Sequence, residues 1–248
     1  MRYLVLTDIH ANLEALDACL ADARARRYDR TLVLGDIVGY GANPNEVIER
    51  VHALEPAAIV RGNHDKVASG IEQADGFNTA ARSAAVWTLE ALTAEHRAWL
   101  AALPQGPLAV DSLIEICHGS PFDEDAYLFD DLDASEALNV SKRPLCLFGH
   151  THASIAFEQS PTAEAVNAVS LKHPEMELVL REGFKYLLNP GSVGQPRDGD
   201  ARAAYGIVDT DRRCVELVRR EYAVEETQAK ILKAGLPEVL AQRLGRGR

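Results

Sequence analysis

Short apolar runs recur along the first part of the chain, and polar residues follow each of them. Three such runs cover residues 3–6, 31–34 and 57–60. Short apolar runs that include β-branched residues and are bounded by turn-forming residues predict β-strands. Each run is followed by a stretch suited to a helix, so the pattern predicts three strand-then-helix units. Such units form a parallel sheet with right-handed crossovers.

Two of the predicted helices have clear starting signals. Asn12 is placed to N-cap the first helix, and Asn43 is placed to cap the second. In the second helix Pro44 takes the first position, and Glu46 has the spacing of a capping box.

Residues 71–105 form an Ala-rich stretch whose apolar positions have helical spacing. Such a segment could cap a functional site or simply pack outside the sheet. Trp87 and Trp99 lie on its apolar face, and aromatic residues at helical spacing usually belong to a core. The packing interpretation is therefore favoured.

The second half of the chain predicts more strands. Runs over residues 113–117 and 145–148 each end next to histidine. Further short runs follow with little helix between them, at residues 155–157, 178–180, 186–188, 205–208 and 215–218. This texture predicts a second, more antiparallel sheet stacked on the first.

Two segments lie outside these strands. Residues 159–174 are polar and read as a surface insertion. Residues 224–244 predict an amphipathic helix pair broken at residues 235–237, and we expect the arginines that close the chain to lie in solvent. No Ser/Gly-rich linker is present, so we expect residues 1–248 to form a single domain.

The charge balance limits the partners. With 26 Lys and Arg against 37 Asp and Glu, the net charge is −11. Such a field repels nucleic acids and anionic membrane surfaces at long range, which argues against both as partners. An anionic substrate would need a local positive charge. Whether the protein forms a homo-oligomer stays open.

The cysteines and the N-terminus suggest a compartment. Four cysteines lie far apart without a Cys-x-x-Cys pair, which favours reduced core thiols. Met1 leads directly into a predicted strand, with no signal-peptide core and no apolar run of membrane-spanning length. We therefore expect a cytoplasmic protein.

Polar residues gather at the carboxyl ends of the predicted strands. Five of the eight histidines follow strand runs, together with two aspartates and an asparagine: His10, His64, His118, His150 and His152 with Asp8, Asp36 and Asn63. Open α/β sheets place their ligands at this edge. In a poorly hydrated cleft these groups would stay unpaired unless ions satisfied them.

Some of these features have simpler interpretations. The stretch Asn63-His64-Asp65 alone could be a turn that caps the next helix. The turn-rich loop 189–199 could present backbone N–H groups or Arg197 to a phosphate, or be only a tight turn. The acidic loop 122–131, with Tyr127, could shape a pocket, although an ordinary surface loop is favoured.

Taken in order, these pieces resemble a known family. The blocks are Asp8-x-His10, Gly35-Asp36, Gly62-Asn63-His64-Asp65, His118 and Gly149-His150-x-His152. Their set and order resemble the calcineurin-like metallophosphoesterase superfamily, and the loop 189–199 resembles that of its small bacterial single-domain members.

The resemblance implies a fold and a metal site. The fold is α/β, a four-layer α/β/β/α sandwich of two stacked mixed sheets flanked by helices. One metal would be held by Asp8, His10 and His152, the other by Asn63, His118 and His150, with Asp36 bridging. Imidazole and oxygen ligands without thiolate suit two divalent transition-metal ions among Mn, Fe, Zn, Ni and Co, with Mn favoured.

The resemblance also implies hydrolysis of a phosphoester. A hydroxide that bridges the metals would attack phosphorus, and His64 would protonate the leaving oxygen as general acid. Asp65 could orient His64 or cap the following helix, and the two readings stay open.

One departure from the family pattern narrows the substrate. Relatives that act on proteins or on symmetrical dinucleoside tetraphosphates carry Asp-Arg-Gly shortly after the bridging aspartate, whereas residues 37–41 here read Ile-Val-Gly-Tyr-Gly. We therefore expect a small-molecule phosphodiester or phosphomonoester. The alternatives are a metallonuclease of the same fold, which the acidic charge disfavours, and a non-catalytic interaction module, for which eroded ligands would be expected.

Overall fold

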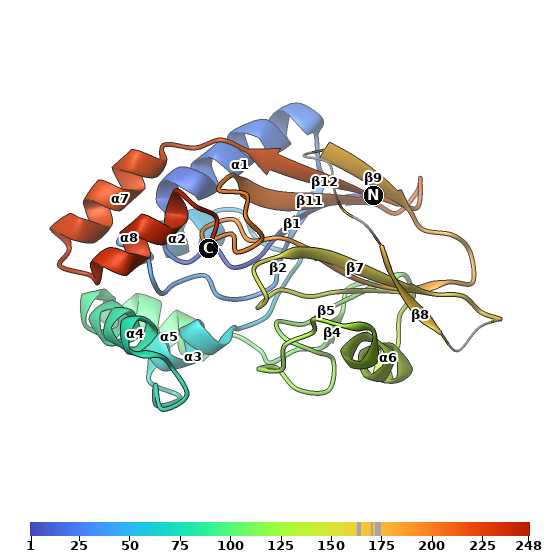
Figure 1. The fold of residues 1–248 in the computed structure, drawn as a ribbon, viewed down its shortest axis with the longest axis horizontal. Coiled ribbons are helices and arrows are strands. Elements are labelled where there is room, and N and C mark those ends of the chain that lie inside the picture. Colours follow the sequence, from blue (N-terminus) through green and yellow to red (C-terminus); the bar gives the residue numbers. More distant parts are fainter. Residues whose placement is uncertain (163–164, 170, 172–174) are drawn as a thin grey trace.

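Two six-stranded sheets lie face to face, and helices cover the outer face of each (Figure 1). The computed structural model describes residues 1–162, 165–169, 171 and 175–248 of the chain. The predicted α/β/β/α sandwich of two mixed sheets is confirmed.

The first sheet combines the two ends of the chain. Its strand order is β3 (Ala58–Ile59), β2 (Arg30–Val33), β1 (Arg2–Leu6), β11 (Ala203–Asp209), β12 (Cys214–Arg220) and β9 (Glu175–Val179). The predicted parallel pairing of β1, β2 and β3 is present, and the later strands add to it in antiparallel fashion. The expectation that all later strands form the second sheet was wrong, because β9, β11 and β12 extend the first.

The second sheet is built from the middle of the chain. Its strand order is β4 (Leu108–Ala109), β5 (Ile114–Ile116), β6 (Leu145–Leu147), β10 (Lys185–Pro190), β7 (Ser154–Gln159) and β8 (Val166–Val169). Strands β5, β6 and β10 run parallel, and the remaining pairs are antiparallel. The carboxyl ends of β5 and β6 therefore point in the same direction.

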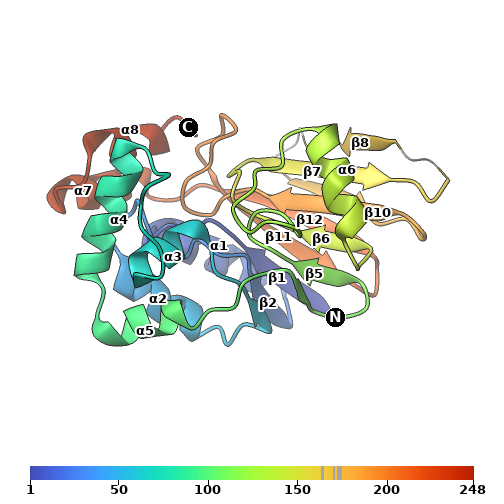
Figure 2. The ribbon, with the colours of Figure 1, turned by 90° about the horizontal axis from the view of Figure 1, so that it is seen from below.

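The helices divide into three groups. Helices α1 (Leu13–Arg26) and α2 (Pro44–His52) pack on the first sheet, and α6 (Asp131–Val140) packs on the second. The other helices lie together at one end of the molecule (Figure 2): α3 (Asn63–Ser69), α4 (Thr79–Ala91), α5 (Ala94–Ala101), α7 (Val224–Lys233) and α8 (Glu238–Leu244). This end lies beside the polar strand edge.

The capping signals were read correctly only in part. Asn12 accepts a hydrogen bond from the backbone N–H of Ala15, as an N-cap does. Asn43 does precede α2, but its side chain makes no capping bond and donates to Glu46 instead.

Alternation along β1 explains the layers. Leu4 and Leu6 face the core formed with α1 and α2, whereas Tyr3 and Val5 face the core between the two sheets. A strand covered on both faces reads as a continuous apolar run, since neither face meets water. The third layer of apolar packing lies between the second sheet and α6.

Two segments differ from the expectation. Helix spans only part of residues 71–105, since residues 70–78 form turns and α4 begins at Thr79. The polar connection at residues 159–174 contains β8, which pairs with β7, so it is not only a surface insertion. The rest of that prediction falls partly on residues 163–164, 170 and 172–174, which lie outside the described residues.

Two simpler expectations concern thiols and membranes. All four cysteines are free and buried, as expected of core thiols. Among the described residues, no helix combines the length and apolar character needed to cross a lipid bilayer.

Candidate metal centre

Loops that leave five strands bring the polar residues together. The candidate ligands follow β1, β2, β3, β5 and β6, and they meet where the two sheets share an edge. Two groups form there, one of Asp8, His10, Asp36 and His152 and the other of Asp36, His118 and His150. In each group the candidate ligand atoms all lie within 4.8 Å of one another, and Asp36 belongs to both.

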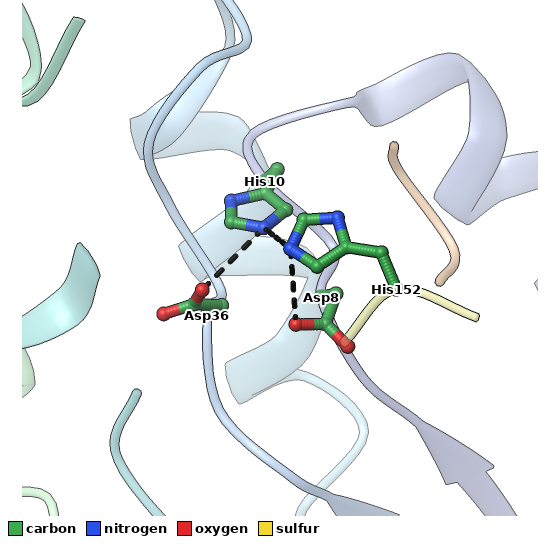
Figure 3. Close-up of side chains that lie close together, drawn as sticks. All are labelled: Asp8, His10, Asp36 and His152. Carbon is green, nitrogen blue, oxygen red and sulfur yellow. Dashed lines mark hydrogen bonds and ion pairs between the residues drawn. The ribbon is translucent and has the colours of Figure 1, made fainter. Parts of the chain in front are cut away.

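The first group has its nitrogen and oxygen atoms directed inward (Figure 3). The Nε2 atoms of His10 and His152 are 3.1 Å apart. Nε2 of His10 lies 3.4 Å from Oδ2 of Asp36, and Nε2 of His152 lies 3.5 Å from Oδ1 of Asp8. All four side chains are buried.

The second group lies on the other side of Asp36. Nε2 of His118 is 3.5 Å from Oδ2 of Asp36 and 3.3 Å from Oδ1 of Asn63. The ring of His150 packs against that of His118, with ring centres 4.9 Å apart. Asn63 thus adds an amide oxygen to this group.

Backbone carbonyls hold the histidine rings and select their protonation. Nδ1 of His10, His118 and His152 lies 3.1, 2.7 and 2.7 Å from the carbonyl oxygens of Val38, Leu34 and Gln195 respectively. A carbonyl only accepts, so each neutral ring carries its proton on Nδ1 and presents a bare Nε2 to the centre. His150 is the reverse, because its Nε2 donates to the Asp125 carbonyl and leaves Nδ1 bare.

Five of the candidate ligands have left-handed backbone conformations. The φ angles of Asp8, His10, Asp36, His150 and His152 lie between 50° and 66°. Residues with a Cβ pay for this conformation, at about 1–3 kcal/mol each, and such strain concentrates at functional sites. The turns after β1, β2 and β6 thus place their side chains at an energetic cost that packing elsewhere offsets.

The centre needs positive charge. Burial alone would raise the pKa of Asp36, but the surrounding histidines, His118 first, hold this pKa well below its usual range. Burial alone would lower the pKa of His118, yet the charges of Asp36 and Asp8 raise it to about 10. Oδ2 of Asp36 is buried and has no hydrogen-bond partner among the described residues. A proton on His118 offsets only part of the negative charge of Asp36 and Asp8.

Divalent cations fit these residues. Burial lowers the pKa of both His10 and His152 well below the usual value, so both rings are neutral. Two bare Nε2 lone pairs then face each other at 3.1 Å. Lone pairs at this separation repel unless a cation lies between or beside them. The imidazole, carboxylate and amide donors suit a first-row transition metal.

His64 lies next to the two groups but belongs to neither of them. Its side chain is buried, and Nδ1 has no hydrogen-bond partner among the described residues. A Cβ at Gly39 would come within 2.5 Å of this Nδ1, so that side of the ring is closed. Burial lowers the pKa of His64 to about 4. The ring packs against His10, Tyr40 and Phe77.

Asp65 has a structural position. Its Oδ2 accepts from the Gly62 backbone N–H at 2.9 Å, and its Oδ1 accepts from Ile37 and Val38 at 2.9 and 3.2 Å. It caps α3 and ties the loop after β2 to that helix. Among the described hydrogen bonds none joins Asp65 to His64. The N-cap position of α3 is Gly62, and Asp65 is the third residue of the helix and completes the capping box. Its role in orienting His64 stays a prediction.

Gly62 is required because of a close contact and not because of its backbone conformation. Its φ of −107° is open to any residue, so the turn itself does not need glycine. A Cβ there would instead lie 2.1 Å from Oδ1 of Asp36. Glycine is needed because Asp36 approaches the backbone this closely.

Arg197 reaches the centre with support that the sequence did not reveal. Its Nη2 donates to Gln195 Oε1 at 2.8 Å and to the Tyr40 hydroxyl at 3.2 Å. Nη1 of Arg243 also donates to Gln195 Oε1, at 3.3 Å. Arg243 belongs to α8 and is partly buried, so the expectation that every closing arginine lies in solvent was wrong for it. Nothing in the local sequence pattern marks Arg243 or Tyr40.

A cavity of about 100 Å³ opens beside both groups. Candidate ligands, His64 and Arg197 line it, together with aromatic side chains. Those aromatic residues are Tyr40, Phe77 and Tyr127. Tyr127 therefore lines a pocket while most of its loop is exposed at the surface, as the favoured interpretation had it. Phe77 and Ala81 line the pocket too, and they also pack on other helices.

Comparison with known proteins supports a family assignment. The chain is 39% identical over 251 residues to an uncharacterized protein of Methanocaldococcus jannaschii, across 98% of this chain and 97% of that protein. It is 40% identical to the crystal structure of a metallophosphoesterase from Sphaerobacter thermophilus, with a TM-score of 0.86 over 100% and 99% of the two chains. A hypothetical protein from Pyrococcus horikoshii, 22% identical, shares the fold with a TM-score of 0.80 over 100% and 98% of the two chains.

The sequence model of the calcineurin-like phosphoesterase superfamily domain matches residues 1–213, which include every candidate ligand and His64. Both the fold and the order of the sequence blocks agree with this match. The chain belongs to the calcineurin-like phosphoesterase superfamily.

Proposed function

We propose that the protein hydrolyses a small-molecule phosphoester with the help of two divalent transition-metal ions. The observation that carries this proposal is the pair of bare Nε2 atoms of His10 and His152, 3.1 Å apart beside two buried carboxylates. No arrangement of protons on two neutral rings whose Nδ1 atoms already donate satisfies both atoms. A cation does.

The donors divide between two ions that share Asp36. Asp8, His10 and His152 would hold one ion, and Asn63, His118 and His150 the other. When bound, divalent ions of this kind lower the pKa of water and neutralise charge that develops on phosphoryl oxygens. Manganese remains the favoured metal, because the site offers hard oxygen donors alongside imidazole.

His64 would move the proton in this reaction. Hydrolysis forms a bond from water oxygen to phosphorus and breaks the bond from phosphorus to the leaving oxygen, which must gain a proton. Nδ1 of His64 lies against Gly39, so Nε2, on the far side of the ring, is the atom that can deliver this proton. An anionic phosphoester beside the ring would favour its protonated form, against the effect of burial.

Arg197 would bind a non-bridging phosphoryl oxygen. It lines the cavity and has no carboxylate partner among the described ion pairs, whereas many arginines of this acidic protein do have one. Gln195 and Tyr40 hold its guanidinium in place from the other side.

A small substrate suits the cavity and the charge. About 100 Å³ admits a phosphoryl group and little more beside the ligands. The net charge of −11 opposes the approach of a nucleic acid, so a nuclease activity is not proposed. The reduced thiols agree with a cytoplasmic location, which we propose with the activity.

The test combines metal content and turnover. The purified protein, loaded with Mn²⁺ and freed of excess metal, should hold about two ions per chain by elemental analysis and hydrolyse bis(p-nitrophenyl) phosphate. Asp36→Asn should lose metal at both positions and turnover with it, because Asp36 belongs to both groups. Asp75→Asn, on an exposed turn, is the matched control. Full metal occupancy in Asp36→Asn would contradict the bridging role, and no hydrolysis of any phosphoester by the loaded protein would refute the proposed activity.

A further inference from the structure

A second cavity, of about 240 Å³, lies beside the candidate metal centre. Residues of the loop 70–78 and of the acidic loop 122–131 line it, and we call it the side cavity. Asn63, Phe77, Tyr127 and His150 line both this cavity and the smaller one at the centre. A substrate whose phosphoryl group lies at the metals can therefore extend into the side cavity.

The walls of the side cavity combine polar side chains with the apolar surfaces of Val67, Phe77 and Tyr127. Val67 of α3 is buried at its base, and Phe77 packs against His64 with ring centres 4.5 Å apart. The ring of Tyr127 stacks on that of His150, with ring centres 3.9 Å apart. The ring of Phe129 stacks on that of Tyr127 in a nearly parallel plane, with ring centres 5.3 Å apart. Aromatic rings fixed by such stacking form a preorganised wall, which lowers the entropy cost of binding.

The charges around the side cavity disfavour a second anionic group. Lys66 is buried and already pairs with Glu72 and Asp125, both of which line the cavity, and with Glu124. Arg61 also pairs with Glu124. Two cations thus face three carboxylates, and neither cation is available to a ligand. Arg197, which has no carboxylate partner among the described ion pairs, lines the central cavity and not this one.

We infer that the side cavity binds a flat, uncharged aromatic group of the phosphoester, such as a phenyl ring or a nucleobase. This inference rests on the proposed function, because it assumes that a phosphoryl group occupies the metal centre. Phe77 and Tyr127 give the cavity apolar surface that a ring of this kind can contact, and the excess carboxylate charge excludes a second phosphate. Gln73, which lines the cavity, offers an amide to the edge of a nucleobase.

Equilibrium binding tests the inference without turnover. Isothermal titration of the Mn²⁺-loaded protein with phenylphosphonate, methylphosphonate and phosphonoacetate compares a ring, a methyl group and a second anion on the same phosphonate. Burial of a phenyl ring should make phenylphosphonate bind about tenfold more tightly than methylphosphonate. Phosphonoacetate should bind no more tightly than methylphosphonate, because the acidic side cavity repels its carboxylate. A nucleoside 5′-monophosphate, compared with ribose 5-phosphate, distinguishes a nucleobase from a simple aryl group.

Variants locate the ring in the side cavity. The double change Phe77→Ala with Tyr127→Ala should bring phenylphosphonate and methylphosphonate affinities to within about threefold of each other. Phe122→Ala removes an exposed aromatic residue of the same loop that does not line the cavity, and it should preserve the wild-type ratio. Elemental analysis of each variant confirms that the metals remain.

The outcomes separate this inference from the proposed function. If the wild-type protein hydrolyses phosphoesters but does not prefer phenylphosphonate, or if the double variant keeps the preference, the aromatic subsite is wrong and the activity stands. If phosphonoacetate binds most tightly, the side cavity selects charge and the inference is overturned. A protein that shows the predicted binding ratios but hydrolyses no ester would support the subsite and refute the activity.

Discussion

Individual residues at this site have backbone conformations that are unfavourable for residues with a side chain. Asp8, His10, Asp36, His150 and His152 all have positive φ, and Gly62 yields space to Asp36. Hydrogen bonds between the loops after β1 and β2 help to hold these conformations, for example the bond from the backbone N–H of His10 to the carbonyl of Asp36. At this scale, small changes of shape should have large effects on metal binding.

Gly62→Ala should disturb the site through contact alone. The added Cβ would lie 2.1 Å from Oδ1 of Asp36, which must then move away from the position it shares between the two groups. We expect metal content to fall at both positions and stability to fall by about 1–3 kcal/mol, measured by elemental analysis and urea unfolding. Gly76→Ala, where a Cβ meets nothing within 4 Å, should change neither quantity. An unchanged metal content in Gly62→Ala would show that Asp36 is free to shift.

His64→Ala should separate metal binding from proton transfer. His64 belongs to neither ligand group, so the variant should retain its metals while kcat falls by about 10²- to 10⁴-fold. The loss should be smaller for esters whose leaving group is strongly acidic, such as p-nitrophenol, because that oxygen needs less protonation. Equal loss across leaving groups of different acidity would argue against a proton-transfer role.

Elements are joined by polar contacts as well as by apolar packing. The Asp22 carboxylate of α1 accepts hydrogen bonds from Tyr205 of β11 and contacts Arg220 of β12, so it ties the helix to two strands. Burial alone would raise its pKa, but the bonds from Tyr205, Arg220 and Arg26 hold this pKa at about 2. The carboxylate is thus ionised in the folded protein at pH values where it is protonated in the unfolded chain.

The position of Asp22 predicts a dependence of stability on pH. A carboxyl group with a lowered pKa stabilises the fold above the unfolded value of about 4, and this contribution is lost as pH falls toward about 2. Asp22→Asn should therefore cost about 1 kcal/mol at pH 7 in urea unfolding, with a smaller difference from wild type at pH 3. Asp17→Asn, on an exposed position of the same helix, is the control. A difference that is constant from pH 7 to pH 3 would contradict the assignment.

The whole molecule assembles a candidate cation-binding centre in an acidic protein. The candidate ligands come from five separate strand ends between residues 8 and 152, so they meet only when both sheets are assembled. Ions that bind there bind the folded state and not the unfolded chain. Metal loading and global stability are therefore linked.

Metal removal should lower the melting temperature. With free Mn²⁺ at about a hundred times its dissociation constant, binding should raise Tm by about 5 °C or more, and chelation should reverse the shift. Asp36→Asn should show little of this shift, since it removes the ligand common to both groups. Differential scanning calorimetry with and without chelator measures it. A Tm that does not respond to metal would mean that the ions bind weakly or outside this centre.

The sequence by itself determined the elements and the chemistry of the strand ends. The apolar run of β1, the Asn12 cap and the order of the blocks around Asp8, Asp36 and His118 follow from local preferences and from residue types, which are readable one segment at a time. The parallel pairing of β1, β2 and β3 was predictable for the same reason, since strand-then-helix units leave one favoured handedness.

Only the tertiary structure decided which distant segments meet. The assignment of β9, β11 and β12 to the first sheet, the contact of Arg243 with Gln195, and the side cavity between Phe77 and Tyr127 depend on pairings between residues far apart in the chain. The positive φ angles of the candidate ligands likewise were not readable from the sequence. Long-range packing overrides local preference at these places, and no local pattern of apolar and polar residues records it.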